Sequence, residues 1–286
     1  MEPIAVHVST VEDSRRWRHV TLRPTDVVIS TPPKCGTTWT QAIVASLLWP
    51  DGDAPVARPW PDWRLGSVEE MAAALDAQTD RRFLKSHCPA DALPYDSAVR
   101  YVFVYRDPAD AFVSWGNHRA NLRPDVVAAL NESAAHDGIE PIPECFDGDY
   151  DVLFEEWSRF WSPAVHLSRS VDLRSAPNAL FLHYADMHAD LPWAMRRIAD
   201  FLEIPVDPAT FGVQVARCEL HEMREAARGT QMDRAFDGGA DAFFYLGGSG
   251  RGRRLLSDEQ VGRVTALTAS LLSPDDAAWL TTGDIA

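Results

Sequence analysis

Four short segments of the chain are β-like, and three of them are mostly apolar and rich in β-branched or aromatic residues. They lie near residues 26–31, 81–87, 99–105 and 179–182. Such runs are typical of strands that are buried on both faces of a parallel sheet. Apolar residues at helical spacing predict helices over about 37–48, 107–119, 150–170 and 185–202, with a last helix from 257. The alternation of strands and helices predicts an α/β fold, doubly wound, with a central parallel sheet flanked by helices.

Turn-forming residues separate these elements. Residues 50–66 are rich in Pro, Asp and Trp and predict a long loop, and residues 133–149 carry Gly and Pro and predict a loop that is a candidate lid. Ser67 is a typical N-cap for a short helix. Two more short helices are expected before and after Glu219.

The chain is long enough for one large domain, because 286 residues can bury a substantial core. There is no internal repeat and no shift in composition that would mark a second domain. We therefore expect a single domain over 1–286, with a core from about 24 to 257 and a helical tail over 257–286. Residues 1–24 show few periodic cues and are interpreted as a lead-in segment.

A turn between the first strand and the first helix carries the clearest candidate chemistry. It reads Ser30-Thr31-Pro32-Pro33-Lys34-Cys35-Gly36-Thr37-Thr38-Trp39. A strand, a tight turn and a helix start bring free backbone N–H groups and the positive end of the helix dipole to one point. Lys34 adds a mobile positive charge there. The segment is either a cradle for phosphate or sulfate or an ordinary turn with a surface lysine.

Other candidate residues also follow predicted strands. Lys85 and His87 close the second strand, Arg106 follows the third and Tyr184 follows the fourth. The carboxyl ends of parallel strands meet at one edge of a sheet, where ligands bind in doubly wound folds. Positions i and i+2 of a strand share a face, so Lys85 and His87 are expected to point into the same crevice. A histidine there is a candidate general base.

Charge narrows the possible partners. The formal net charge is −15, so no basic surplus exists for nonspecific nucleic-acid binding. The four cysteines are widely spaced, and neither zinc-site spacing nor a need for disulfides is evident. The N-terminus lacks an apolar signal core, and the longest apolar run is too short to span a bilayer. We expect a cytoplasmic protein without a transmembrane segment.

A nucleotide kinase or NTPase is disfavoured by the order of residues in the turn. The phosphate loop of those enzymes reads Gly-x-x-x-x-Gly-Lys followed by Ser or Thr, and it needs an acid for magnesium. Here Lys34 precedes Gly36, and Pro32-Pro33 replace the flexible glycines. A lysine that supplies its own charge suits transfer of a less charged group without a metal.

Five segments in order resemble the soluble sulfotransferases, which use 3′-phosphoadenosine-5′-phosphosulfate (PAPS) as the sulfuryl donor. The first, Pro33-Lys34-Cys35-Gly36-Thr37-Thr38-Trp39, resembles the P-loop-like phosphosulfate-binding loop of the family. The others are Lys85-Ser86-His87-Cys88-Pro89, Tyr105-Arg106-Asp107-Pro108 with Ser114, His183-Tyr184-Ala185-Asp186-Met187, and Phe243 to Gly250. The last has a form similar to bacterial glycolipid-type members. The resemblance extends from residue 26 to about 257.

The resemblance implies a role for each matching residue. Lys34 would neutralise the leaving phosphate, His87 would remove the acceptor proton, and Lys85 would steady the sulfuryl group. Donor binding would involve Lys34, Cys35, Gly36, Thr37, Thr38, Trp39, Arg106, Ser114, Tyr184, Met223, Gly247 and Arg251. The transfer would be in line, without a covalent enzyme intermediate or a metal. The acceptor would be a small and apolar phenol, alcohol, lipid or glycolipid with a hydroxyl or amine.

Departures from the family pattern leave an alternative open. Tyr245-Leu246 stand where the family has an Arg-Lys pair on the 3′-phosphate, and Arg251, Arg253 and Arg254 are candidates to replace it. Of the family strip around Cys218 to Met223, only the methionine is retained. The alternative function is a catalytically weak, nucleotide-binding pseudoenzyme. No motif in the sequence indicates an oligomeric state.

Overall fold

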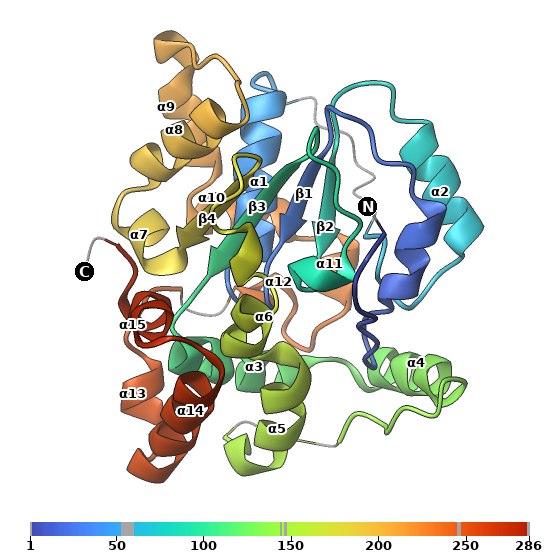
Figure 1. Cartoon of the computed structure of the whole chain (residues 1–286), viewed down its shortest axis with the longest axis vertical. Helices are drawn as coiled ribbons and strands as arrows, with labels where there is room; N and C mark the ends of the chain where they lie inside the picture. The colour runs from blue at the N-terminus through green and yellow to red at the C-terminus, as the bar shows by residue number, and fades with distance from the viewer. Residues whose placement is uncertain (1, 53–59, 144, 146–147, 245–246, 285–286) are drawn as a thin grey trace.

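A four-stranded parallel sheet forms the centre of the protein (Figure 1). The computed structural model describes residues 2–52, 60–143, 145, 148–244 and 247–284. The strands lie in the order β2-β1-β3-β4. Their bounds are β1 Val27–Ser30, β2 Phe83–Ser86, β3 Arg100–Tyr105 and β4 Ala179–His183. The α/β fold and the four strands are as the apolar runs predicted.

The register of the sheet brings the carboxyl ends of its strands to one edge. Ser30 at the end of β1 pairs with Ser86 at the end of β2 and with Phe103 of β3. Tyr105, the last residue of β3, pairs with His183, the last residue of β4. The segments that follow the four strands therefore start close together, which positions the candidate site.

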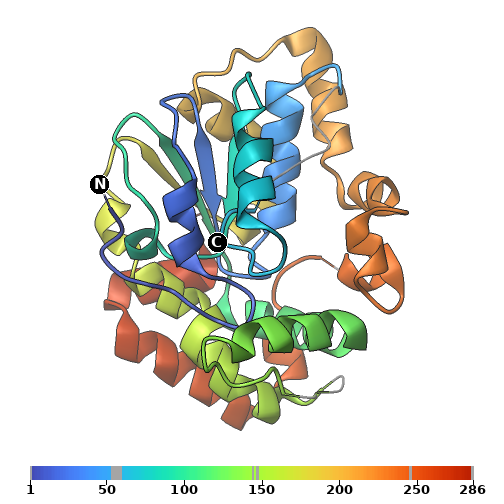
Figure 2. The same cartoon turned by 90° about the vertical axis from the view of Figure 1, so that its right-hand side faces the viewer.

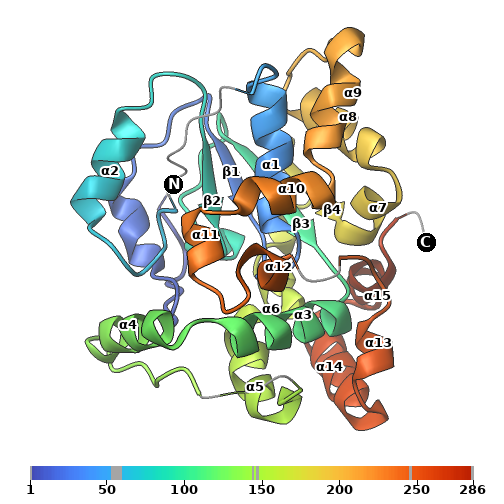
Figure 3. The same ribbon diagram turned by 180° about the vertical axis from the view of Figure 1, so that it is seen from behind.

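Helices surround the sheet (Figures 1 and 3). Their bounds are α1 Thr37–Leu48, α2 Val68–Asp76, α3 Pro108–Asn121, α4 Pro124–Ala135, α5 Tyr150–Glu156, α6 Pro163–Ser168, α7 Tyr184–Ala189, α8 Leu191–Phe201, α9 Pro208–Arg217, α10 Leu220–Ala227, α11 Gln231–Arg234, α12 Gly239–Phe243, α13 Gly252–Leu255, α14 Asp258–Leu271 and α15 Pro274–Thr282. Shorter turns are the 3₁₀ segments η1 Ser14–His19, η2 Ala90–Ala92 and η4 Val171–Leu173 and the π-helical segment η3 Trp157–Trp161.

The two faces of the sheet pack against different helices because side chains alternate along each strand. On one face, Val27, Ile29, Val102 and Val104 join buried residues of α1 and α8. On the other face, Val28 and the aromatic residues of β3 pack against α6, α15 and η1. Helices α3, α5, α13 and α14 form a further layer beyond the carboxyl edge (Figure 2). Among the described residues, no helix is long and apolar enough to cross a bilayer.

Several predicted helices are divided in the structure. The predicted helix over 150–170 passes from α5 into the π-helical η3 and stops at Ser162, which caps α6 with Pro163 in its first turn. Asp190 caps α8 and separates it from α7, because Pro192 favours a new helix start. The predicted C-terminal helix is likewise two helices, α14 and α15. In each case a capping residue followed by proline outweighs the apolar period.

The structure also differs from the prediction in the lead-in segment and at the start of one predicted loop. The predicted lead-in contains η1, whose Trp17 is 2% exposed and packs in the core on the same face of the sheet as Val28. The predicted loop over 133–149 begins inside α4, which ends at Ala135. The proposed single domain and the lid stay predictions.

Candidate active site

The turn after β1 has the conformation of an anion-binding loop. Lys34 has φ 66° and Gly36 has φ 102°, both in the left-handed region. Gly36 is the N-cap of α1 and has no side chain to cap the helix, so the first N–H groups of α1 face the turn. The Thr37 hydroxyl is in contact with the Thr31 hydroxyl at 2.5 Å, which ties the start of the helix to the end of the strand.

Aromatic side chains gather on one side of this loop. A Cβ added at Gly36 would lie 3.1 Å from the Tyr184 ring, so the loop and the ring are in close contact. Trp39 meets Tyr184 edge to face at 5.3 Å and donates from Nε1 to the carbonyl of Cys218 at 2.8 Å. Gly247 also lies beside Tyr184. Met223 is buried with Phe244 in a cluster against which Trp39 packs.

Arg106 links the loop to the C-terminal part of the chain. Its guanidinium donates to the carbonyl of Lys34 at 3.1 Å and to that of Gly248 at 2.7 Å. The guanidinium carbon lies 4.5 Å from the centre of the Tyr184 ring. Nε of Arg106 is buried and has no hydrogen-bond partner among the described residues. Arg106 thus brings a partly unsatisfied cation to the site.

Lys34 lies in an environment of like charge. Burial, together with the nearby charges of Arg106 and Lys85, lowers the pKa of Lys34 to about 7. Its Nζ lies 3.4 Å from Nδ1 of His118 and 4.5 Å from the centre of the Phe243 ring. A bound anion would stabilise the ammonium form of Lys34 strongly, because it would offset the repulsion from the neighbouring positive charges.

Lys85 lies opposite acidic groups instead. Its Nζ is 3.3 Å from the centre of the Trp60 ring. Burial lowers the pKa of Lys85 to about 8, and the carboxyls of Asp62 and Glu12 oppose that shift. Lys34 and Lys85 are the only two lysines of the chain, beside 25 arginines. Both lysines of the protein therefore belong to the candidate site.

The ring of His87 is held in one tautomer. Its Nδ1 lies 2.7 Å from the backbone carbonyl oxygen of Thr31. A carbonyl can only accept, so Nδ1 carries the proton and Nε2 keeps its lone pair. Burial, and after it the charge of Lys85, lowers the pKa of His87 well below 6.5. Near pH 7 the ring is neutral and can accept a proton at Nε2.

The remaining predicted donor contacts lie on α3 and near α13. Ser114 is half-buried on α3, four residues before His118 and therefore on the same face of the helix. Arg251 is half-buried, whereas Arg253 and Arg254 are exposed. The carboxylate of Asp110 accepts from the N–H groups of Gly250 and Gly252 at 2.7 and 2.6 Å. Tyr245 and Leu246 lie outside the described residues.

Two backbones approach closely where the loop that carries Arg251 meets the start of α3. A Cβ at position 252 would come within 2.3 Å of the backbone of Ala109, so only glycine fits there. Two residues of the loop that carries Arg251 are thus held against the start of α3.

Sequence reasoning assigned no individual role to four residues of the site. His118 and Phe243 contact Lys34, Trp60 contacts Lys85, and Asp62 accepts hydrogen bonds from the segment around His87. His118 also stacks on Trp115, with ring centres 5.4 Å apart. The spacing of His118 four residues after Ser114 was an available signal. Trp60 and Asp62 lie in a predicted loop without periodic cues, so the sequence offered no signal for either residue.

The fold and the loop define an α/β protein with a cation-lined anion site at the carboxyl edge of its sheet. The sulfotransferase domain family matches residues 24–273, and the chain belongs to this family. The predictions of the family, of the fold and of a PAPS-dependent transferase are therefore confirmed. Among the described residues, no group of three or more His, Cys, Asp or Glu side chains is arranged for a metal ion.

Known relatives agree with this assignment. Glycolipid sulfotransferases of Mycobacterium tuberculosis and Mycobacterium bovis are each 32% identical to the chain, over 96% of this chain and 93% of theirs. The rat sulfotransferase 1A1 is 26% identical over 73% of this chain and 70% of its own. A retinol dehydratase in complex with androsterone and PAP superposes with a TM-score of 0.70 at 20% identity, covering 91% of this chain and 86% of that chain.

Proposed function

We propose that the protein moves the sulfuryl group of PAPS to a hydroxyl or amine of a small, apolar acceptor, with His87 as general base. The observation that carries this proposal is the contact between His87 Nδ1 and the Thr31 carbonyl. It leaves Nε2 as the proton acceptor and attaches the base to the loop that bears Lys34. A donor-binding loop and a base joined in this way suit transfer to an acceptor that enters beside His87.

Three side chains take part in the proposed reaction. The acceptor oxygen or nitrogen attacks sulfur as its proton passes to Nε2 of His87. The bond between sulfur and the bridging oxygen breaks, and the electron pair stays on the leaving phosphate. Lys34 stabilises that developing charge, and Lys85 steadies the sulfuryl oxygens. The products are the sulfated acceptor and the 3′,5′-bisphosphate of adenosine (PAP).

The donor fits the chemistry of the surrounding groups. The N–H groups of Gly36, Thr37 and Thr38 would hold the 5′-phosphate at the start of α1. Arg106, whose Nε is buried without a partner among the described residues, would hold the 3′-phosphate together with Ser114. Trp39 and Tyr184 would enclose the adenine, with Met223 and Gly247 beside them. Cys35 would contribute through its backbone, because burial raises the pKa of its thiol to about 12.

An apolar acceptor is supported by the rings around the two lysines. Trp60 lies 5.0 Å from His87, and Phe243 contacts both Lys34 and the ring of His118. Trp157 and Trp161, from the aromatic segment over 150–161, are buried in the core and are therefore not positioned to contact an acceptor. The mycobacterial relatives are named glycolipid sulfotransferases, which favours a glycolipid hydroxyl among the possible acceptors.

The test uses PAPS that carries radiolabelled sulfur and a panel of acceptors. The panel contains a glycolipid, a phenol, an aliphatic alcohol and an amine, each with a matched derivative whose hydroxyl or amine is blocked. We expect label in a hydroxyl-bearing apolar acceptor and none in its blocked form. Calorimetry with PAP runs in parallel. Tight PAP binding without transfer to any acceptor would favour the pseudoenzyme, and absence of both would overturn the proposal.

A further inference from the structure

A buried carboxylate lies behind the segment that carries Lys85 and His87. Asp62 is 0% exposed. Its Oδ2 accepts from the Ser86 hydroxyl at 2.7 Å, from the Cys88 thiol at 2.9 Å and from the His87 backbone N–H at 3.3 Å. These three donors come from consecutive residues immediately after Lys85. Asp62 thus fixes the backbone from which both proposed catalytic side chains project.

The opposite side of the same segment is held by the loop after β1. The His87 ring is bonded to Thr31, whereas its backbone N–H is bonded to Asp62. Two fixed points on one residue leave little freedom for its side chain. We propose that Asp62 is a positioning residue that orients His87 and Lys85 by holding the backbone that carries both, a role that rests on the proposed sulfuryl transfer.

The electrostatic part of this role depends on the groups that surround Lys85. The two acidic groups are Asp62, from the loop before α2, and Glu12, from the N-terminal segment. The other groups are Lys34 from the loop after β1, His87 directly after β2 and His118 from α3. The two carboxyls are the groups among them that favour the ammonium form. A buried lysine without such a partner loses its proton readily.

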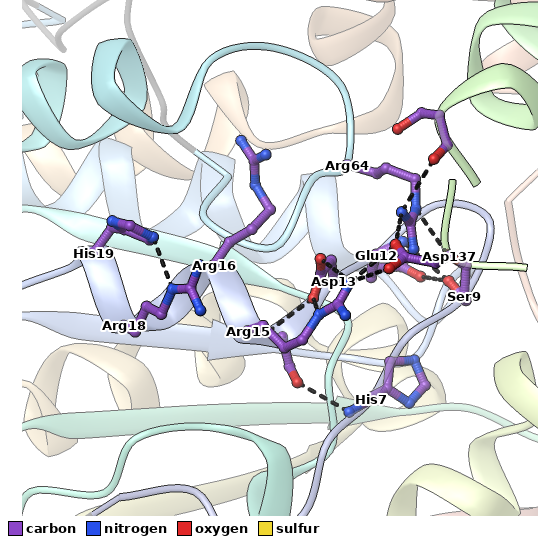
Figure 4. A network of polar contacts seen from close by, with 12 residues as sticks. His7, Ser9, Glu12, Asp13, Arg15, Arg16, Arg18, His19, Arg64 and Asp137 are labelled. Carbon is purple, nitrogen blue, oxygen red and sulfur yellow. Dashed lines mark hydrogen bonds and ion pairs between the residues drawn. The ribbon is translucent and has the colours of Figure 1, made fainter. Parts of the chain in front are cut away.

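Of the two carboxyls, Asp62 is the better candidate for the charged one. Glu12 is also 0% exposed, but among the described residues its side-chain donor is the Ser9 hydroxyl at 2.6 Å, seen in Figure 4. Burial, with Asp62 nearby, raises the pKa of Glu12 well above its usual range. Burial raises the pKa of Asp62 as well, and the three donors to its Oδ2 offset part of that rise. Its three donors therefore make Asp62 the better stabilised carboxylate of the two.

The N-terminal segment supports Asp62 from behind. The backbone N–H of Asp13 donates to the carbonyl of Asp62 at 2.8 Å, and that of Arg64 donates to Val11 at 2.9 Å. Asp13 and Asp137 are joined through Arg15, and Arg64 also pairs with Asp137 (Figure 4). Part of the segment over 1–24, interpreted as a lead-in from the sequence, thus holds the loop that carries Asp62 in place.

The test exploits the two lysines of the chain. Enzyme labelled with ¹³C at lysine Cε gives two side-chain signals, and Lys34→Met assigns the signal of Lys85. In Asp62→Asn we expect the pKa of Lys85 to fall by about one unit or more, because the carboxylate charge is lost. We expect kcat for sulfuryl transfer to fall at least about tenfold while the Kd for PAP stays within about threefold.

Controls separate this role from a structural one. Asp125→Asn removes an exposed carboxyl that pairs with Arg123 and should move neither the Lys85 titration nor kcat. Glu12→Gln should shift the Lys85 titration less than Asp62→Asn does. If Asp62→Asn does not fold, Ser86→Ala removes a donor to the carboxylate and should shift Lys85 in the same direction by less.

Two results would overturn the proposal. One is a folded Asp62→Asn protein, or Ser86→Ala protein, in which Lys85 titrates as in the parent. The other is a kcat that does not change in Asp62→Asn. If the parent enzyme transfers no sulfuryl group to any acceptor, the proposed function fails, while the lysine titration still reports on Asp62.

Discussion

Nδ1 of His87 lies 2.7 Å from the backbone carbonyl of Thr31, three residues before Lys34. The proposed base and the proposed electrophilic lysine are therefore parts of one connected unit at the carboxyl edge of the sheet. A displacement of the loop after β1 would move both. Substitutions of His87 that keep or lose the bond to Thr31 can therefore separate the role of His87 as a base from its role in holding the loop.

Two substitutions of His87 distinguish these contributions. Asn places an amide N–H near the former Nδ1 and can still donate to Thr31, but it removes Nε2. We expect His87→Asn to lower kcat by about 10²–10⁴-fold with PAP affinity nearly unchanged, because only the base is lost. His87→Ala should lower kcat as much and also weaken PAP binding. Steady-state kinetics and calorimetry measure both, and transfer at the parent rate by either variant would rule out His87 as the base.

The protonation of Lys34 should make donor binding depend on pH. The pKa of Lys34 without donor is about 7. An anionic donor favours the ammonium form and raises that pKa, so binding takes up a proton between the two pKa values. The affinity for PAP should therefore fall as pH rises above about 7, by at most tenfold per pH unit. Calorimetry in buffers of different ionisation enthalpy measures the uptake.

Lys34→Met provides the comparison for this measurement. With no amine at position 34, the proton uptake above pH 7 should disappear and the pH dependence should flatten. Lys85→Met should leave most of the uptake in place, because Lys85 already has Asp62 and Glu12 beside it. An uptake that survives in Lys34→Met would assign the proton to another group.

The sequence predicted the fold and much of the site because both depend on short-range patterns. The β-like runs marked all four strands, and the order of strand and helix placed Lys34, His87, Arg106 and Tyr184 at one edge of the sheet. The hydrogen bonds then bring Arg106 to Lys34 and His87 to Thr31. No sequence period specifies these side-chain contacts.

The missed features depend on contacts between distant parts of the chain. Asp62 meets Ser86 and His87 across 24 and 25 positions, and His118 meets Lys34 across 84. The division of the predicted helix over 150–170 has a local cause, the cap at Ser162, but the apolar period continues through it. The hydrophobic pattern of the sequence thus does not predict buried polar contacts or the caps that divide a helix.

Arg106 provides a test of donor binding apart from chemistry. Its planar guanidinium reaches the carbonyls of Lys34 and Gly248 at once, which a lysine ammonium cannot reproduce. We expect Arg106→Lys and Arg106→Gln each to raise the KM for PAPS by about tenfold or more, with a smaller change in kcat at saturation. Arg123→Gln is the control, since Arg123 is exposed and pairs with Asp125. An unchanged KM for PAPS in both variants would contradict the 3′-phosphate role.

Gly36 allows the strain of the loop to be separated from its contact with Tyr184. At φ 102° an alanine is strained, and its Cβ would lie 3.1 Å from the Tyr184 ring. Gly66 has φ 89° and nothing within 4 Å of the corresponding position. We expect Gly66→Ala to lower the free energy of unfolding by about 1–2 kcal/mol through the backbone alone. Gly36→Ala should cost at least as much and also weaken PAP binding, because the ring must move.

Thermal unfolding and calorimetry with PAP compare the two variants directly. The difference between them isolates the ring contact, since both carry a similar backbone strain. In Gly36→Ala the displaced Tyr184 also disturbs Trp39 and Arg106, which lie against the same ring. We therefore expect the loss of affinity in Gly36→Ala to exceed what its lower stability explains. Equal PAP affinity in Gly36→Ala, Gly66→Ala and the parent would show that Tyr184 and the loop do not act together in binding the donor.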